Sequence, residues 1–419
     1  MESVIRFFKY KDLRNRAIYV LALLVVFRIL ASTPIPGVDL EKIHRFFASN
    51  QFLGLLNLFS GGAMRNFSLA MLGVGPYITA IIIMQLLTLI LPRLKEMYYE
   101  EGEMGRAKFN RYSRYLTVPL ATVQGFGFLN FLRVQGIYQP ENWFMIIEDV
   151  ILVVAGSIFL MWIGELITTK NLGNGISIII FAGIVAGWPQ TIRATILGYS
   201  AEKLSTYLAF FVMAVLVVAG IVIVNEAERR IPVTYAKRVR GMKMYGGFST
   251  YLPIKVNQAG VIPIIFALAV VLFPQFLAQF LSGVDNIVAQ KISEICIAFL
   301  RNNWLYGIFY FLLVFVFTYF YTAVTFDPKE ISQNLQRWGG FIPGIRPGPQ
   351  TAQFLKKVIY RTTFVGALFL GVVAILPLIT RSFTGSAALS IGGTSILIVV
   401  AVVIEIINQI KAELAMREY

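Results

Sequence analysis

The sequence has very few of the residues that hold metals or carry out covalent catalysis. Its 419 residues include one cysteine, Cys296, and one histidine, His44. A single cysteine cannot form an internal disulfide, and one residue of each type cannot build a Cys/His metal site. His44 lies beside Arg45 in a polar segment, where a solvated surface side chain is expected. We therefore expect neither a metal site nor a cofactor.

Catalytic motifs are missing as well. The chain has no Gly-x-x-x-x-Gly-Lys-Ser/Thr loop for nucleotide phosphates, and one histidine excludes a His-Glu-x-x-His zinc motif. A membrane protease of the Ser–His type needs a histidine inside a span, and His44 lies outside the apolar runs. An aspartyl protease needs two facing aspartates, whereas Asp149 has only Glu148 beside it. The sequence thus indicates a protein that is not an enzyme.

Charge is the third scarcity. Only 14% of the residues are charged and 57% are hydrophobic, whereas about a quarter of a soluble domain is charged. The apolar residues gather in runs close to the length of about 20 residues that crosses a bilayer, rather than in short alternating strands. The runs cover residues 15–33, 76–91, 115–131, 146–167, 176–192, 207–224, 261–281, 304–324, 363–379 and 389–407. We predict an all-α integral membrane protein with ten transmembrane helices.

Basic residues give the orientation of these spans. The first run is not read as a cleaved signal peptide, because Arg28 interrupts it and nine more runs follow. With alternating spans, 27 of the 37 Lys and Arg residues fall on the side of the N-terminus, nine fall on the other side, and Arg28 lies within a span. Cytoplasmic loops carry the excess of Lys and Arg. Both termini are therefore predicted to be cytoplasmic.

Two of the basic loops are long, covering about residues 225–256 and 326–361. In the first, apolar stretches around Ile231 and Phe248 flank Gly241 and predict a strand pair with a tip. In the second, the prolines and glycines of Pro343–Gly348 predict a stiff turn that holds Arg346 outward. The alternative is that these basic residues only enforce topology, which suffices for most of them. Arg346 differs from them, because membrane topology does not need a basic residue to be held in a rigid turn.

One apolar segment, residues 59–76, cannot span. Its glycines leave a helix of only about ten residues, over about 62–72, and it carries Arg65. Irregular backbone at membrane depth is tolerated only inside protein or beside a water-filled cavity. The segment therefore either lies in the outer interface, which the physics slightly favours, or re-enters the protein as a plug.

Buried carboxylates, which ion-coupled transporters usually need, are scarce in the spans. Beyond the first few residues of each run, the charged residues are Arg28, Glu165 and Glu405, and all three lie toward the cytoplasmic or outer ends of the spans. Snorkelling or a satisfied helix-end charge explains them, so a proton relay is not supported.

Seven motifs resemble the SecY family of protein-conducting channels, in order from about residue 10 to 410. They are Pro34–Gly37, Met161–Glu165, Asn174–Gly187, Tyr235–Arg238, Asn257–Pro263, Pro343–Gly348 and Gly392–Val400. The resemblance implies two pseudo-symmetric halves of five spans, residues 1–195 and 196–419, hinged in the loop near 189–203. It also implies passage of unfolded secretory polypeptides and lateral release of hydrophobic segments into lipid.

The resemblance assigns roles to individual residues. The pore ring would be Val74, Ile78, Ile180, Ile265 and Ile398, although each could simply pack between helices. The plug would be a short helix that includes Gly62, Ala63, Met64, Arg65, Asn66, Phe67, Ser68 and Leu69, and this reverses the slight preference for the interface. Gln85 and Asn257 would be polar residues of the lateral gate, with static helix packing as the alternative.

The resemblance also implies partners. Arg240, Lys243 and Arg346 would contact the motor ATPase SecA or the rRNA of a ribosome, because Arg and Lys suit acidic patches and phosphates alike. SecE and SecG would be companion subunits, signal sequences and nascent polypeptides the cargo, and lipid the surroundings in a bacterial inner membrane. A secondary transporter of a small solute is the alternative function, and it would need a polar midplane site.

Overall fold

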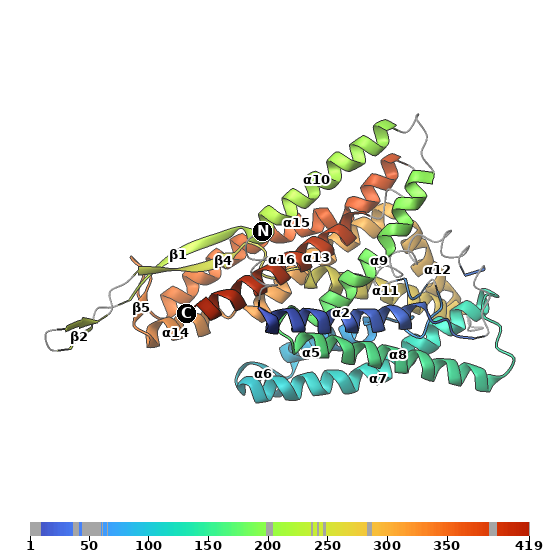
Figure 1. The fold of residues 1–419 in the computed structure, drawn as a ribbon, viewed down its shortest axis with the longest axis horizontal. Coiled ribbons are helices and arrows are strands. Elements are labelled where there is room, and N and C mark those ends of the chain that lie inside the picture. Colours follow the sequence, from blue (N-terminus) through green and yellow to red (C-terminus); the bar gives the residue numbers. More distant parts are fainter. Residues whose placement is uncertain are drawn as a thin grey trace.

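The computed structural model describes residues 10–36, 42–43, 60, 62–64, 66–197, 204–235, 238–240, 243–245, 249–282, 287–384 and 392–418. Within these ranges the ten predicted runs fall on ten long helices (Figure 1). Most ends shift by a few residues, but α7 and α15 begin more than ten residues before their runs and α16 ends more than ten residues after its run. These helices are α2 (Lys11–Ser32), α5 (Gly75–Ile90), α7 (Gly102–Val134), α8 (Trp143–Thr168), α9 (Gly175–Leu197), α10 (Leu204–Glu226), α11 (Ile262–Ser282), α13 (Asn303–Thr325), α15 (Pro349–Thr384) and α16 (Gly392–Glu418).

The apolar helices make the chain a multi-pass membrane protein. Seven of them are long and apolar enough to cross a bilayer alone, and α5 would be an eighth span together with α6 (Pro92–Tyr99), from which a bend of 108° separates it. Pro92 opens α6, since a proline is tolerated in the first turn of a helix. The apolar parts of α9 and α11 are shorter, over Gly175–Gln190 and Ile262–Val271. The count of ten spans therefore stays a prediction.

Two further helices lie in the loops. Helix α12 (Ile287–Arg301) follows α11 and packs against it, and helix α14 (Pro328–Arg337) precedes the turn that contains Arg346. Asp327 caps α14 by accepting a hydrogen bond from the backbone N–H of Lys329. The sequence did not predict α12 as a helix, because its apolar residues fall short of a spanning run.

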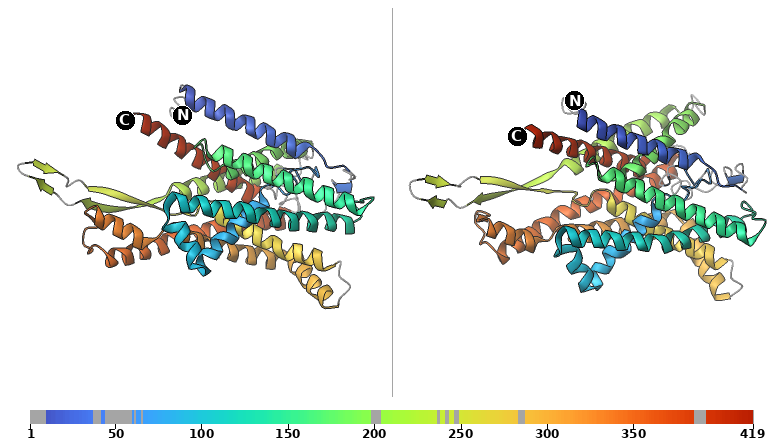
Figure 2. Two further views of the ribbon diagram at one scale, coloured as in Figure 1. Left: turned by 90° about the horizontal axis from the view of Figure 1, so that it is seen from below. Right: turned by 60° about the horizontal axis from the view of Figure 1, so that its bottom comes forward.

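The two long basic loops form one small sheet at the end of the bundle. Strand β1 (Glu228–Tyr235) pairs antiparallel with β4 (Ser249–Lys255) on one side and with β5 (Gly340–Phe341) on the other. Beyond them, β2 (Arg238–Arg240) pairs with β3 (Lys243–Tyr245). This second pair extends away from the helices in all three ribbon views (Figures 1 and 2). The predicted strand pair is confirmed, whereas Gly241 at its tip and Phe248 lie outside the described residues.

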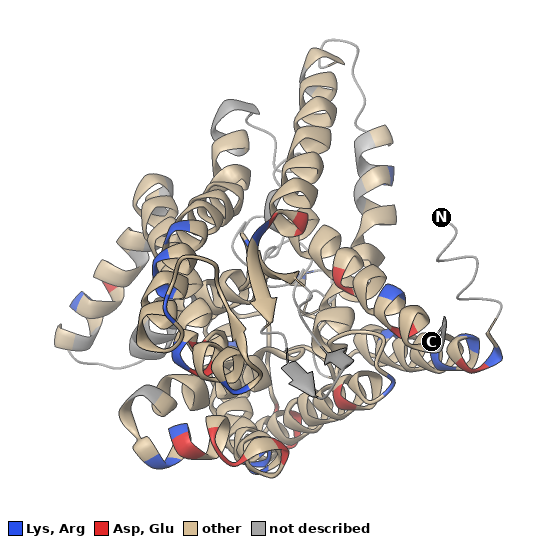
Figure 3. Cartoon of the chain, turned by 90° about the vertical axis from the view of Figure 1, so that its left-hand side faces the viewer, with Lys and Arg blue, Asp and Glu red and all other residues tan. Residues whose placement is uncertain are grey.

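Buried apolar residues form three clusters. The largest joins α2, α5, α8, α9, α10, α11, α13, α15 and α16, and the second joins the residues before α5 to α7 and α8. The third lies between β1, β4, α14 and the start of α15, and it includes Ile231, Leu335 and Leu355. The basic loops are thus held by a core of their own. Figure 3 views the molecule from the end that carries the sheet, and charged residues lie there mainly around helix ends and loops.

Candidate functional site: an aliphatic constriction beside a buried re-entrant segment

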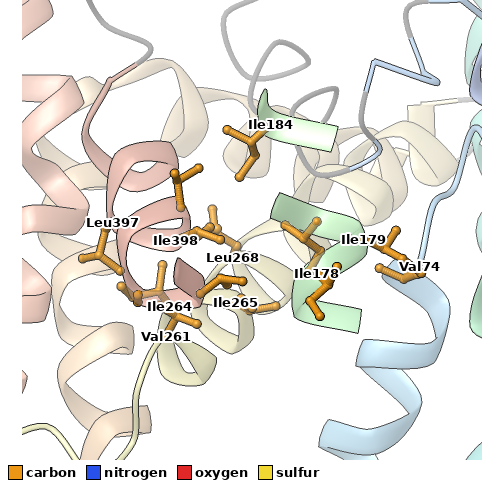
Figure 4. Close-up of a cluster of buried hydrophobic side chains, with 14 of the residues drawn as sticks. Val74, Ile178, Ile179, Ile184, Val261, Ile264, Ile265, Leu268, Leu397 and Ile398 are labelled. Atoms are coloured by element: carbon orange, nitrogen blue, oxygen red, sulfur yellow. The ribbon is translucent and has the colours of Figure 1, made fainter. Parts of the chain in front are cut away.

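Residues of four helices meet in the middle of the largest cluster. Ile180 of α9, Ile265 of α11 and Ile398 of α16 are all buried there, with Val74 just before α5. Ile78 of α5 is half-buried and packs against the same cluster. Figure 4 shows Val74, Ile265 and Ile398 among their aliphatic neighbours. The structure therefore brings all five residues of the predicted ring into one apolar cluster, whereas the role of that cluster as a pore ring stays a prediction.

The cluster has the chemistry of a seal rather than of a binding site. Its buried members are aliphatic and aromatic side chains, and the described residues contain no group of three or more His, Cys, Asp or Glu side chains that could hold a metal. A narrow constriction with such a lining loses its water and so presents a barrier to ions. The five residues of the predicted ring are all aliphatic, so their side chains offer no polar group that would select a small solute.

The re-entrant segment between α2 and α5 is buried inside the protein. Of its described residues, Ala63, Phe67, Ala70 and Met71 have no exposed side-chain surface. In place of the predicted single helix, the described residues form successive hydrogen-bonded turns, with Phe67 at a φ of 45°. The left-handed φ of Phe67 interrupts any helix at that point. Arg65 lies outside the described residues.

Backbone hydrogen bonds attach this segment to the end of α2. The backbone N–H of Ile35 donates to the carbonyl of Phe67 at 2.8 Å, and the N–H of Leu69 donates to the carbonyl of Thr33 at 3.2 Å. The side chain of Asn66 adds a hydrogen bond of 3.3 Å to the carbonyl of Ala31. The described part thus has its polar backbone satisfied within protein, as a plug requires, and its role as the plug stays a prediction.

Helix α8 forms the opposite wall of the segment. A side chain at Gly156 would collide with the backbone carbonyl of Leu69, so only glycine permits this approach. One residue later, the Ser157 hydroxyl donates a hydrogen bond of 3.0 Å to the carbonyl of Gly73. Helix α8 thus fixes the backbone immediately before Val74.

A buried polar pair supports the segment from the loop between α7 and α8. The ring of Phe67 packs against the ring of Tyr138 with 6.0 Å between centroids, and the Tyr138 hydroxyl donates to the carboxylate of Asp149. Burial and this hydrogen bond raise the pKa of Tyr138 well above its ordinary value. Sequence reasoning placed Asp149 at a helix end without a partner. The structure buries it, with only 1% of its surface exposed.

The two polar residues of the predicted gate are both buried but do not bond to each other. Asn257 donates hydrogen bonds to the Oδ1 of Asn225 at 2.7 Å and to the carbonyl of Gly260 at 3.2 Å. The Oε1 of Gln85 is buried and has no hydrogen-bond partner among the described residues. Helix α11 contacts both α5 and α7, so the seam exists as a helix contact. Its role as a gate stays a prediction.

Glu165, one of the charged residues within the predicted spans, has a partner of opposite charge. Glu165 of α8 forms an ion pair with Arg114 of α7, with 2.5 Å between Oε1 and Nε. Both side chains are partly exposed. This ion pair confirms the prediction that Glu165 is a satisfied helix-end charge.

The basic loops present their cations on a rigid frame. Arg346 is exposed, and the turn around it is fixed by the Thr351 hydroxyl, which donates to the Arg346 carbonyl, and by the Ser332 hydroxyl, which donates to the Gly348 carbonyl. Gly344 and Gly348 take φ values of 80° and 99°, which favour glycine. Arg240 and Lys243 are opposite each other in the β2–β3 register, next to the tip. The predicted stiff turn at Arg346 is confirmed.

Comparison with known proteins decides the family. A sequence model of the SecY family matches residues 68–407. The protein translocase subunit SecY of Thermotoga maritima is 44% identical over 427 aligned residues, which cover 98% of this chain and 95% of that protein. The chain belongs to the SecY family.

Solved structures agree with the fold of a SecY protein. One is a SecY structure from work on how the plug domain stabilises the closed state of the channel. It has a TM-score of 0.63 at 22% identity, and the match covers 94% of this chain and 90% of that chain. Sec61 in the canine ribosome-channel complex has a TM-score of 0.60 at 20% identity, covering 94% and 91%. SecY proteins are protein-conducting channels and not enzymes, so both predictions are confirmed, and a small-solute transporter is not favoured.

Proposed function

We propose that an unfolded polypeptide passes through the aliphatic cluster, with Val74, Ile78, Ile180, Ile265 and Ile398 as its ring. The observation that carries this proposal is that residues contributed by four helices meet in one buried apolar cluster. A sliding chain finds no strong binding site among aliphatic side chains, so the ring resists ions without retaining the cargo. Hydrophobic segments leave sideways into lipid.

The re-entrant segment acts as the plug of this channel. Its contacts with α2 and α8 favour a closed resting state, and the turns that end at Val74 place it directly against the ring. Displacement of the segment would break a few hydrogen bonds, each worth about 1 kcal/mol net. A polypeptide that inserts into the channel can supply that energy.

The seam where α11 meets α5 and α7 serves as the lateral gate, with Gln85 and Asn257 at its polar positions. Hydrogen bonds between helices in membranes are worth about 0.6 kcal/mol on average. Gln85 and Asn257 do not hydrogen-bond to each other, so this pair does not lock the seam. A hydrophobic signal sequence can compete with the helix packing there. The residues 1–195 and 196–419 would then move as two halves about the loop near 189–203.

The sheet of the basic loops is the docking platform for a cytoplasmic partner, either SecA or a ribosome, with Arg240, Lys243 and Arg346 as contacts. The exposed Arg346 on its fixed turn supports this role, and a relative in fold occurs in a ribosome-channel complex. SecE and SecG would complete the assembly; α2 and α10 are the least buried of the candidate spans and offer faces for a single-span partner. We place the chain in a bacterial inner membrane with both termini cytoplasmic.

Disulfide trapping tests the route of the cargo. In a Cys296→Ser background, an arrested secretory polypeptide with one cysteine should form disulfides with Ile180→Cys and Ile398→Cys. The matched control is Val215→Cys on the exposed face of α10, which should give none. Equal trapping at all three positions, or trapping at Val215→Cys alone, would contradict a route through the cluster.

A further inference from the structure

A cavity of about 430 Å³ lies where the first basic loop meets α15. Three cations line it: Arg229 at the start of β1, and Lys357 and Arg361 on α15. The remaining wall is mostly apolar and includes Phe354, Val358 and Val365. Its volume lies within the range of about 300–1,000 Å³ that is usual for small-ligand sites.

The three cations have no counter-charge of their own. No acidic side chain lines the cavity, and within the described residues none of the three takes part in an ion pair. The neighbouring Arg230, by contrast, is paired with Glu228 at 2.7 Å. Orientation in the membrane needs basic residues on one side but does not need them to converge on a cavity. The cavity therefore suits an anion.

The position of the cavity points to the class of that anion. Lys357, Arg361, Val365, Leu368 and Val372 follow one another at intervals of three or four residues, so they lie along one stripe of α15. The three apolar members are exposed, on a helix that crosses the bilayer. The stripe thus changes from cationic to lipid-facing within about one turn. An amphipathic anion with a long apolar tail matches both parts.

The walls of the cavity are fixed by close packing. A side chain at Gly366 would lie 2.7 Å from the backbone carbonyl of Val256, so α15 and the end of the first basic loop approach each other closely at this level. Val256 is itself held by a hydrogen bond of 2.9 Å from its N–H to the carbonyl of Ala227. The cationic rim is therefore preformed, which lowers the cost of binding.

We propose that this cavity binds the headgroup of an anionic phospholipid from the leaflet that adjoins the basic loops, with Arg229, Lys357 and Arg361 around the phosphate and an acyl chain along Val365, Leu368 and Val372. Basic pockets between helices on this kind of surface suit lipid headgroups. Bound lipid would brace the first basic loop against α15.

Native mass spectrometry of the full chain in detergent tests the proposal, with phosphatidylglycerol and phosphatidylcholine of equal acyl length as probes. The wild-type chain should retain phosphatidylglycerol at least about tenfold better. Each cation near an anionic headgroup contributes roughly a fivefold gain, so Arg229→Gln/Lys357→Gln/Arg361→Gln should weaken retention roughly a hundredfold. The matched control, Arg111→Gln/Lys329→Gln/Lys411→Gln, removes three other exposed cations and should change retention less than about twofold.

Several results would overturn the site. They are equal retention of the two lipids by the wild-type chain, or wild-type retention of phosphatidylglycerol by the triple variant. If the triple variant does not fold, Lys357→Gln and Arg361→Gln alone should each lower retention about fivefold, and unchanged retention in both would reject the proposal. Glycerol phosphate should not displace the lipid at equal concentration; if it does, the site recognises a free or nucleic-acid phosphate and the lipid assignment is wrong.

Discussion

The Tyr138 hydroxyl donates a hydrogen bond to the Asp149 carboxylate, while the ring on the same side chain packs against Phe67 of the plug. The loop that carries Tyr138 thereby supports the segment that lies against the proposed pore ring. Tyr138→Phe would remove the donor and leave a buried carboxylate without it. We expect a loss of about 2 kcal/mol in the free energy of unfolding and faster hydrogen exchange in residues 66–74. Thermal unfolding and exchange mass spectrometry measure both.

A second variant separates the hydrogen bond from the packing. Tyr138→Phe combined with Asp149→Leu removes both polar groups and should recover part of the lost stability, because no buried carboxylate is left unpaired. Equal stability of the wild type and Tyr138→Phe would show that the pair does not support the plug.

Gly156 sets how closely α8 approaches the plug. Gly156→Ala would place a methyl group against the Leu69 carbonyl and should push the segment away, at a cost of about 1–3 kcal/mol. We expect a measurable ion leak through reconstituted channels. Gly127→Ala is the matched control, since a methyl group there meets nothing within 4 Å. A leak in both variants, or in neither, would contradict this role of Gly156.

Arg346 tests the docking platform. Arg346→Glu should lower SecA- or ribosome-driven translocation by roughly tenfold or more, because a reversed charge opposes the partner where the native charge attracted it. Membrane insertion should stay normal. Arg337→Glu, which reverses another basic residue at the end of the nearby α14, serves as the control. Undiminished translocation by Arg346→Glu would show that Arg346 serves only to orient the protein in the membrane.

The shared core of the two loops makes a further prediction. Leu335 of α14 packs in the same cluster as Ile231 and Val233 of β1. Leu335→Ala should cost about 3 kcal/mol and expose both loops to proteolysis at once. Gln333→Ala, on the exposed side of α14, should change neither cleavage rate. Cleavage of only the second loop would show that the two loops are independent.

Sequence reasoning reached the features that depend on local pattern or on the family resemblance. The apolar runs, the strand pair and the turn at Arg346 follow from local composition, and the ring residues from the motifs around Ile180 and Ile398. Their grouping in one cluster, as well as the pairing of Phe341 with Thr234, needed the structure. The pairing joins loops about a hundred residues apart, and a two-residue strand leaves no sequence signal.

Other features were out of reach for a physical reason. Asp149 beside Glu148 looks like a solvated helix end, and only the structure shows that it is buried beneath Tyr138, whose ring packs against the distant Phe67. The plug was expected as a helix because its composition permits one. The positive φ of Phe67 follows from packing against α2, α8 and Tyr138, and tertiary contacts override local preference there.

The ion conductance of the reconstituted channel tests the central claim most directly. Ile78, Ile180 and Ile265 would be replaced together by asparagine, and conductance across a planar bilayer measured without any polypeptide substrate. If these side chains form the apolar ring, water will enter the constriction and a steady ion leak will appear where the wild type gives none. Conductance that stays at the wild-type level would contradict the assignment of the aliphatic cluster as the seal of the channel.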